Sequence, residues 1–193
     1  MNRPLADRLG DGRYQVVRAL GAGGEGQVVL AEDRLRGDRV VLKWRHDGAV
    51  DERPAEYEAL ARLSHPGIVA VLDVFRDRTV SASVMVEPWL EGADLETAMT
   101  ALDASDLARL ADQAVGALSF LHARGLRHGD IKPANLFVIH DAAEPRLQLI
   151  DFGMVAACRH PDWPGATPAY LAPELRTGRP PSEAMDWYAL GLT

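Results

Sequence analysis

The chain is poor in lysine, cysteine and long apolar runs, and each shortage narrows the classes of protein to which it can belong. Two lysines and nineteen arginines make up its 21 basic residues, and its one cysteine is Cys158. A single cysteine cannot form an internal disulfide, which suits a reducing compartment, so we expect a cytoplasmic protein. No apolar run approaches the ~20 residues of a membrane helix, and residues 1–13 lack the apolar stretch of a signal peptide.

A basic surface is also missing. The formal net charge is -7 over 193 residues, whereas nucleic-acid-binding domains usually carry a basic face. We therefore expect neither nucleic acid nor an anionic membrane surface as a partner. The hydrophobic fraction of 47% is ordinary for a globular protein that buries a core.

The first half of the chain has the pattern of a β-sheet with one helix. A helical spacing begins near Pro54, a residue suited to a first helical turn, and His65-Pro66-Gly67 stops it. Short runs bounded by turn residues indicate strands in the rest of this half. The expected strands lie at residues 13–20, 27–32, 39–44, 68–75 and 80–87.

The second half has a different character. An amphipathic helix is predicted over residues 105–123, with Ser105 as its N-cap and Gly125 just past its end. The fold class is therefore α+β, with a five-stranded sheet and one helix in residues 13–90 and a mainly helical part in residues 91–193. Further elements are expected as short strands at 136–139 and 147–150, an irregular loop at 154–165, the start of a helix at 186–192 and a hinge at 91–93.

A glycine-rich segment lies between the first two expected strands. Residues 20–28 read LGAGGEGQV, which fits G-x-G-x-x-G-x-V. Glycines let a backbone approach phosphates closely, and its amides then bind the anion. A glycine hairpin without any ligand remains an open alternative. A position between two strands disfavours dinucleotide binding, which needs a helix N-terminus there.

The first lysine follows this segment at the end of a strand. Lys43 ends the run VVLK, seventeen residues after Gly26. A compact ammonium there can reach phosphate oxygens, a role in which arginine is not an equivalent residue. Such a lysine needs a carboxylate to hold it, and Glu56 on the predicted helix is the candidate, with Glu58 as the nearby rival. An ordinary surface ion pair is the alternative.

The second lysine belongs to the most specific motif. Residues 128–135 read HGDIKPAN and place Asp130, Lys132 and Asn135 in one loop after the long helix. The carboxylate can accept a hydroxyl proton, the ammonium can neutralise a moving phosphoryl group, and the amide can bind a metal. Sixteen residues later, Asp151 ends a predicted strand and opens a DFG triplet. One carboxylate, one amide and phosphate oxygens form a set that suits magnesium.

Together these motifs resemble the eukaryotic-type serine/threonine protein kinases, in the style found in bacteria. The glycine-rich segment, the strand lysine, the HGDIKPAN loop and the DFG triplet match in order and spacing. The segments GATPAYLAPE at 165–174 and DWYALG at 186–191 look like the substrate-docking segment and the helix that anchors the catalytic loop. The resemblance runs from about Tyr14 to the last residue and implies a bilobal kinase-like fold with a β-rich first lobe.

The resemblance implies transfer of the γ-phosphoryl group of ATP, with Mg²⁺, to Ser/Thr hydroxyls of a protein substrate. Asp130 would act as base, Lys132 would contact the γ-phosphate, and Thr167 would bridge the two. Lys43, held by Glu56, would bind phosphates. Asn135 and Asp151 would carry magnesium. The nucleotide would contact Leu20, Gly21, Ala22, Gly23, Gly24, Gly26, Val28, Val41, Lys43, Glu87 and Trp89.

The chain departs from the family in its catalytic loop and at its end, among other positions. Gly129 precedes the catalytic-loop aspartate where the family commonly has arginine, and the sequence stops at Thr193, early in the anchoring helix. We therefore expect a missing C-terminal region or a partner to cover the second part. Two alternatives stay open. One is a nucleotide-binding pseudokinase or truncated regulatory module. The other is a small-molecule phosphotransferase of the aminoglycoside or choline type, whose loop also begins His-Gly-Asp.

Overall fold

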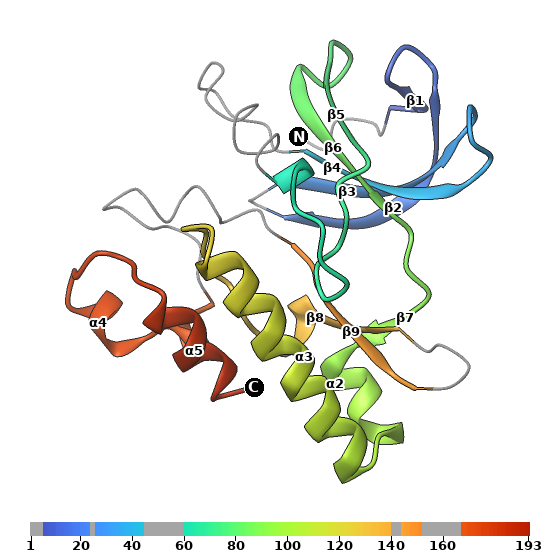
Figure 1. The fold of residues 1–193 in the computed structure, drawn as a ribbon. Helices are drawn as coiled ribbons and strands as arrows, with labels where there is room; N and C mark the ends of the chain where they lie inside the picture. The colour runs from blue at the N-terminus through green and yellow to red at the C-terminus, as the bar shows by residue number, and fades with distance from the viewer. Residues whose placement is uncertain (1–5, 24–25, 45–59, 140–143, 152–166) are drawn as a thin grey trace. The chain divides into compact units, whose positions relative to one another are not determined.

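The computed structural model divides into two compact units (Figure 1). It describes residues 6–23, 26–44, 60–139, 144–151 and 167–193, and only the backbone of residues 22, 23 and 26. The sheet unit comprises the described parts of Met1–Ser64 and Ala70–Trp89. The helical unit comprises His65–Val69 and the described parts of Leu90–Thr193.

The sheet unit contains six antiparallel strands among its described residues, in the order β1-β2-β3-β4-β6-β5. This is one more than predicted, because the two-residue strand β1 is too short to leave a sequence pattern. The predicted strand at 39–44 is confirmed as β4. The bounds are β1 Arg8–Leu9, β2 Tyr14–Gly23, β3 Gly26–Asp33, β4 Arg39–Trp44, β5 Asp73–Asp77 and β6 Ala82–Pro88.

The predicted strand at 68–75 is wrong over its first part. Ile68 forms a parallel bridge with Leu149, and the Val69 amide donates to the Leu149 carbonyl at 3.0 Å. These residues therefore bind within the helical unit, and the strand of the sheet unit starts at Asp73. Apolar runs of this kind do not reveal which sheet they join, because the partner lies far away in the sequence.

Alternation along β4 and β6 separates the two faces of the sheet. Val40, Leu42 and Trp44 lie in the core cluster of the sheet unit, together with Val84 and Val86. Successive side chains of a strand point to opposite faces, so the residues between them share the other face. Burial of these aliphatic and aromatic side chains is the main source of stability of the sheet unit.

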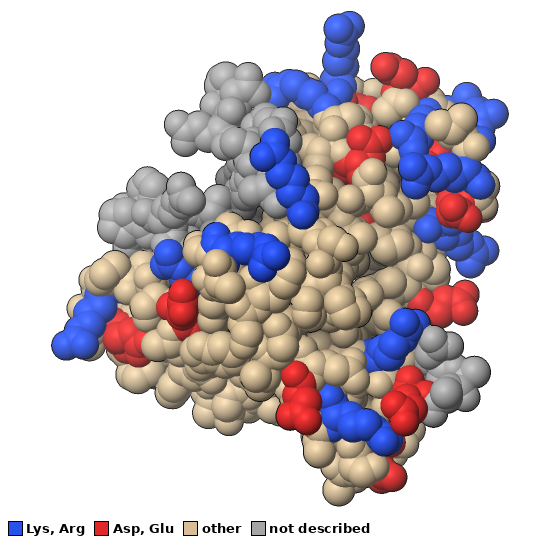
Figure 2. All heavy atoms as spheres, in the orientation of Figure 1, with Lys and Arg blue, Asp and Glu red and all other residues tan. Residues whose placement is uncertain are grey.

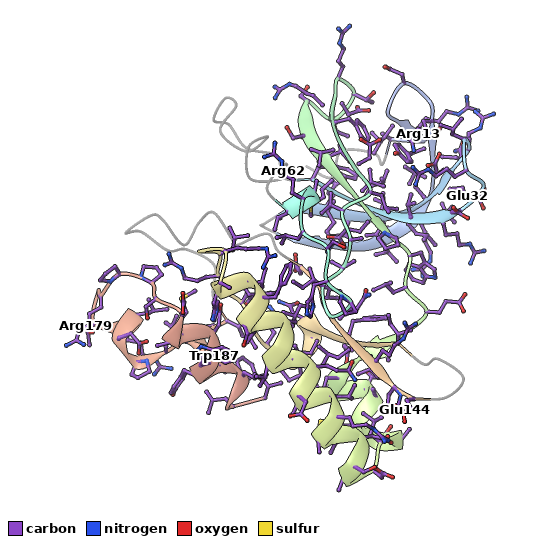
Figure 3. The ribbon with its side chains drawn as sticks, viewed as in Figure 1. Arg13, Glu32, Arg62, Glu144, Arg179 and Trp187 are labelled. Carbon is purple, nitrogen blue, oxygen red and sulfur yellow. The ribbon has the colours of Figure 1, made fainter. Side chains whose placement is uncertain are left out.

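A charged cluster joins three strands of the sheet unit. The Arg13 guanidinium, labelled in Figure 3, donates to both oxygens of buried Asp33, at 3.0 and 2.7 Å, and to Asp73 Oδ2 at 2.8 Å. The Tyr14 hydroxyl donates to the same Asp73 oxygen at 3.2 Å. The hydrogen bond from Arg13 is the main cause that lowers the pKa of Asp33. Bidentate pairing of this kind is among the stronger polar contacts and ties β3 and β5 to the start of β2.

The helical unit combines a three-stranded antiparallel sheet with four α-helices among its described residues. The predicted strand at 136–139 is confirmed as β8. The expected hinge at 91–93 is wrong in part, because Gly92 begins β7 and pairs with Ile139. The bounds are β7 Gly92–Asp94, α2 Leu95–Ala98, α3 Ala104–His122, β8 Leu136–Ile139, β9 Arg146–Leu149, α4 Pro173–Arg176 and α5 Ala184–Leu190.

Helix α3 is the long amphipathic helix that the sequence predicts. Its N-cap is Asp103 and not Ser105, because the Asp103 carboxylate accepts from the Ser105 and Asp106 amides at 2.7 and 2.8 Å. The Asp106 carboxylate accepts from the Asp103 amide in return, which completes a capping box. Gly125 follows the helix end with a φ of 69°, as expected of a residue at that place. Within the described ranges, no helix has the length and apolar character needed to cross a bilayer.

A buried carboxylate on α5 holds the segment at 128–129. Asp186 is 1% exposed and accepts from the amides of His128 and Gly129 at 2.9 and 2.8 Å. Its Oδ2 also lies 2.8 Å from His122 Nε2 on α3. Burial alone would raise the pKa of Asp186, but the hydrogen bond from His122 and those from the amides lower it below its usual value. The carboxylate therefore stays ionised and links α3, α5 and the loop.

The His128 ring is buried in its neutral form. Its Nε2 lies 3.0 Å from the Ile150 carbonyl, and its Nδ1 accepts from the Asp130 amide at 3.3 Å. A second ring proton on Nδ1 would face that amide proton. Burial is the main cause that lowers the pKa of His128 below its usual value. The next residue, Gly129, has a φ of 85°, a conformation that glycine adopts without strain.

Charged side chains are unevenly spread over the described surface. Figure 2 shows basic and acidic side chains interspersed over the sheet unit, whereas the middle of the helical unit is largely uncharged on this face. Val115 on α3 and Trp187 and Tyr188 on α5 are exposed by 45%, 36% and 40%. The Trp187 ring meets the His122 ring edge-on, with centroids 5.1 Å apart.

Two glycines of the α3 region are expected to respond oppositely to substitution by alanine. Gly116 lies inside α3 with open space around it, so Gly116→Ala should raise the free energy of unfolding by about 0.5–1 kcal/mol. Gly125→Ala should lower it by about 1–2 kcal/mol, because alanine is strained at a positive φ. Urea unfolding of both variants measures the effect. A destabilised Gly116→Ala protein would contradict the placement of Gly116 inside α3 with open space around it.

The buried His128 predicts a loss of stability in mild acid. In the unfolded chain its pKa is about 6.5, and in the folded chain it is lower, so below pH 6.5 the unfolded state binds more protons. The unfolding free energy should therefore fall as the pH drops below 6.5, because protons bind the unfolded chain first. Asp186 adds a further loss only below about pH 4, the usual carboxyl range.

Urea unfolding at pH 7.5 and 5.5 tests this expectation. His65 is the second group to be varied, because burial also lowers its pKa. His128→Gln and His65→Gln should each reduce the difference between the two pH values. Equal stability of the unmodified chain at both pH values would show that His128 does not titrate as its burial implies.

Candidate active site

Three side chains of the helical unit meet around the Asp130 carboxylate, which belongs to a residue that is 9% exposed. Its Oδ2 accepts from Lys132 Nζ at 2.6 Å and from Asn135 Nδ2 at 3.1 Å. Its Oδ1 accepts from the Thr167 hydroxyl at 3.1 Å and from the Thr167 amide at 3.3 Å. The Thr167 hydroxyl in turn accepts from Lys132 Nζ at 3.0 Å. The structure thus brings Asp130, Lys132, Asn135 and Thr167 into one hydrogen-bonded cluster.

Local structure explains this convergence. Ile131 is 1% exposed and anchors the loop, and the backbone at Lys132 is extended. Pro133 begins a 3₁₀ turn over Pro133–Asn135, for which its fixed φ is suited. The turn returns Asn135, whose Nδ2 donates to the Asp130 carbonyl at 2.7 Å. Asn135 therefore closes the loop as well as contacting the carboxylate.

Asp151 is held next to this loop through the backbone. The Ile150 amide donates to the Asn135 carbonyl at 3.0 Å, which places residue 151 beside the loop. Asp151 is exposed and has a φ of 65°, an uncommon conformation for a residue other than glycine. Such backbone strain is found preferentially at functional sites. Phe152, Gly153 and the loop predicted at 154–165 lie outside the described residues.

The donor set fits a hard divalent cation. The Asn135 amide nitrogen points to Asp130, which leaves its side-chain oxygen for a metal, and Asp151 supplies an exposed carboxylate. In the part of the chain that the structure describes, no cluster of three or more His, Cys, Asp or Glu side chains is arranged to bind a metal. Two protein oxygens with further ligands from phosphate and water are the usual arrangement for magnesium.

A pocket opens beside the cluster within the helical unit. Asp130 and Thr167 form one part of its wall, and Asp186 forms another. Its remaining lining is mostly apolar and includes Tyr170, Leu171 and Met185. The Asp130 carboxylate therefore borders a partly apolar hollow built by the segment at 167–175 and α5.

The sheet unit gathers a second set of predicted residues on one face. Cross-strand pairing sets Val28 opposite Lys43, and Val41 opposite Glu87. The strand alternation puts all four on the face opposite the core cluster. Gly23 pairs with Gly26 and closes the glycine-rich hairpin, and Gly21 pairs with Val28.

Two more of the predicted residues lie within or directly after strands of this unit. Leu20 lies at an irregularity of β2 and is half-buried, and the Trp89 amide donates to the Arg39 carbonyl at 3.2 Å. The side chain of Ala22 and the whole of Gly24 lie outside the described residues.

Lys43 has a partner that the sequence did not reveal. Its Nζ lies 2.9 Å from Glu87 Oε2. Glu56, the predicted partner, and Glu58 lie outside the described residues. The predicted strand at 80–87 held the available signal for this partner. Once the strand register is known, the alternation of side chains puts Glu87 on the same sheet face as Lys43. The register itself cannot be read from the sequence.

Comparison with known proteins agrees with the motif pattern. Residues 14–193 match the family model described as protein kinase domain. The DNA damage-responsive serine/threonine-protein kinase RqkA of Deinococcus radiodurans is 37% identical over 194 residues, which cover 93% of this chain and 29% of that protein. Serine/threonine-protein kinase Pkn1 of Myxococcus xanthus is 33% identical, with 94% and 28% covered. The chain thus spans less than a third of the length of these relatives.

A solved structure supports the fold. The crystal structure of the PknI kinase domain of Mycobacterium tuberculosis superimposes with a TM-score of 0.73 at 30% identity, and the match covers 98% of this chain and 75% of that one. The predicted kinase-like α+β fold is therefore confirmed. From the family match, the relatives and this structural likeness together, the chain belongs to the protein kinase domain family.

Proposed function

We propose that this chain transfers the γ-phosphoryl group of ATP to serine or threonine hydroxyls of a protein substrate, in the cytoplasm and with Mg²⁺. The observation that carries the proposal is the cluster in which Asp130 receives hydrogen bonds from Lys132, Asn135 and Thr167. The named serine/threonine-protein kinases among its relatives support the substrate class. We further propose that residues 13–90 and 91–193 serve as the two lobes of this enzyme.

Asp130 is suited to act as the base. Several donors fix both carboxylate oxygens, so the group is oriented before any substrate arrives. In the proposed reaction, a substrate hydroxyl takes the place of the Thr167 hydroxyl on Oδ1 and gives its proton to Asp130. The oxygen of the substrate hydroxyl forms a bond to the γ-phosphorus of ATP. At the same time the bond between that phosphorus and the bridging oxygen breaks, and ADP leaves. Positioning and charge stabilisation supply most of the rate in such transfers.

Lys132 is suited to stabilise the moving phosphoryl group. Its Nζ contacts Asp130 Oδ2 and Thr167 Oγ1, and an ammonium has three donors. The remaining donor can be directed at a phosphate oxygen without breaking the contact to the base. The ammonium would thus keep the phosphoryl group and the accepting carboxylate close together.

The sheet unit supplies the proposed nucleotide contacts. Val28 and Val41 offer apolar surface to the adenine, with Leu20 and the segment from Glu87 to Trp89 beside it. The glycine-rich hairpin and Lys43 would bind the phosphates. The alignment of Val28, Val41 and Lys43 on one sheet face supports this assignment.

Asn135 and Asp151 would hold magnesium, which supplies positive charge to the phosphate oxygens. The backbone hydrogen bond from Ile150 to Asn135 supports their joint role, because it keeps the two residues adjacent. The side-chain orientation of Asn135, with its nitrogen on Asp130, leaves oxygen as the ligand atom.

Asp130→Asn is expected to abolish transfer and preserve nucleotide binding. Asparagine keeps the size of the side chain but does not accept the hydroxyl proton, so transfer should fall at least about 100-fold. Incorporation of labelled phosphate from ATP into a generic protein substrate measures transfer, and tryptophan fluorescence measures the nucleotide Kd. Exposed Asp112 on α3 gives the matched control, since Asp112→Asn should change neither quantity.

The same measurements distinguish the competing functions. A wild-type chain that binds ATP but labels no substrate, alone or with the rest of its natural protein, would be a nucleotide-binding module. A chain that labels aminoglycosides and not protein would be a small-molecule phosphotransferase. Asp130→Asn protein with undiminished transfer would remove Asp130 from the reaction.

A further inference from the structure

Lys43 and Glu87 form an ion pair inside the sheet unit. Lys43 Nζ lies 2.9 Å from Glu87 Oε2, and the two side chains are 16% and 4% exposed. Lysine and glutamate are among the residues least often found at such burial, and they occur there mainly as pairs. This pair is formed by the lysine to which we assign phosphate binding.

The sheet register produces the contact. Lys43 pairs with Met85 across β4 and β6, and Val41 pairs with Glu87, so Lys43 and Glu87 are diagonal neighbours on the same face. Long side chains reach each other across such a diagonal. Both residues stand on central strands with continuous pairing, β4 between β3 and β6, and β6 between β4 and β5. The pair is therefore held by the sheet and needs no helix to form.

The stability of the sheet unit does not explain why a glutamate occupies the buried position 87. Its Oε1 is buried and has no hydrogen-bond partner among the described residues. An oxygen left in this state costs free energy, and replacing a buried ion pair by apolar residues is often neutral or stabilising. The neighbours Leu30 and Met85 on this face are apolar and buried, so an apolar residue at 87 would fit the surroundings better.

We propose that Glu87 is a positioning residue for Lys43, so that the phosphate-binding ammonium of this chain is held by a carboxylate of its own sheet. The proposal rests on the proposed function for its consequence in catalysis. Donation to one Glu87 oxygen is compatible with donation to phosphate oxygens, because an ammonium has three donors.

The low lysine content makes a direct test possible. Lysine labelled with ¹⁵N at the ζ position and ¹³C at the ε position gives two side-chain signals, from Lys43 and Lys132, and a Lys132→Met sample assigns them. Glu87→Gln, which preserves shape and removes the charge, should shift and broaden the Lys43 signal and leave the Lys132 signal in place. Exposed Glu32 on β3, labelled in Figure 3, provides the control, since Glu32→Gln should move neither signal.

This measurement needs neither nucleotide nor activity, so it judges the pair even if the proposed function fails. A Lys43 signal unchanged in Glu87→Gln, or one that moves in Glu56→Gln instead, would overturn the proposal. Backbone amide dispersion reports whether each variant is folded. If Glu87→Gln does not fold, the double variant Lys43→Met/Glu87→Met is measured. A folded double variant shows that the single variant unfolded because the Lys43 ammonium lacked its carboxylate. An unfolded double variant overturns the positioning role.

Steady-state kinetics then tests the consequence for the reaction. Glu87→Gln should raise the KM for ATP about tenfold, the size expected for loss of one charge-assisted contact, and change kcat less than about threefold. Glu32→Gln, the control variant, should change KM less than about threefold. A lower KM in Glu87→Gln would mean that the carboxylate competes with phosphate for Lys43 and would contradict positioning. A wild-type chain without transfer activity would count against the proposed function only, and the spectroscopic result would stand.

Discussion

The buried carboxylate of Asp186 is the contact on which the position of the loop at 128–135 depends. It accepts from two consecutive amides, at His128 and Gly129, and from the His122 ring. Backbone amides removed from water need an acceptor, and an ionised carboxylate is a strong one. Because the three donors come from α3 and from the loop, one side chain of α5 fixes the start of the segment that carries Asp130.

The positions of the residues after Gly129 are set by a series of short-range hydrogen bonds. His128, neutral and buried, connects the Asp130 amide with the Ile150 carbonyl. Asn135 closes the turn, and its carbonyl receives the Ile150 amide just before Asp151. The loop and the end of β9 are therefore tied together twice. This explains how two motifs sixteen residues apart, one ending in Asn135 and the other beginning at Asp151, come to lie next to each other.

The sheet unit uses a different device for its lysine. Register across β4 and β6, and not a loop, sets Lys43 beside Glu87. A sheet holds side chains more rigidly than a loop, at the cost of a carboxylate buried with one oxygen unpartnered. The two lysines of the chain thus both contact a carboxylate, Lys43 through strand pairing and Lys132 through a tight loop.

The sequence by itself determined the elements whose signals are local. The strand at 39–44, the amphipathic helix that became α3, and the order of the loop residues from Asp130 to Asn135 could be predicted, because alternation, helical period and motif spacing act over a few residues. Only the tertiary structure decided which distant groups meet. It chose Asp103 over Ser105 as a cap, joined Ile68 to Leu149, and gave Lys43 the partner Glu87. Those choices depend on backbone direction and strand register, which are set by packing of the whole unit and leave no mark on any short stretch of sequence.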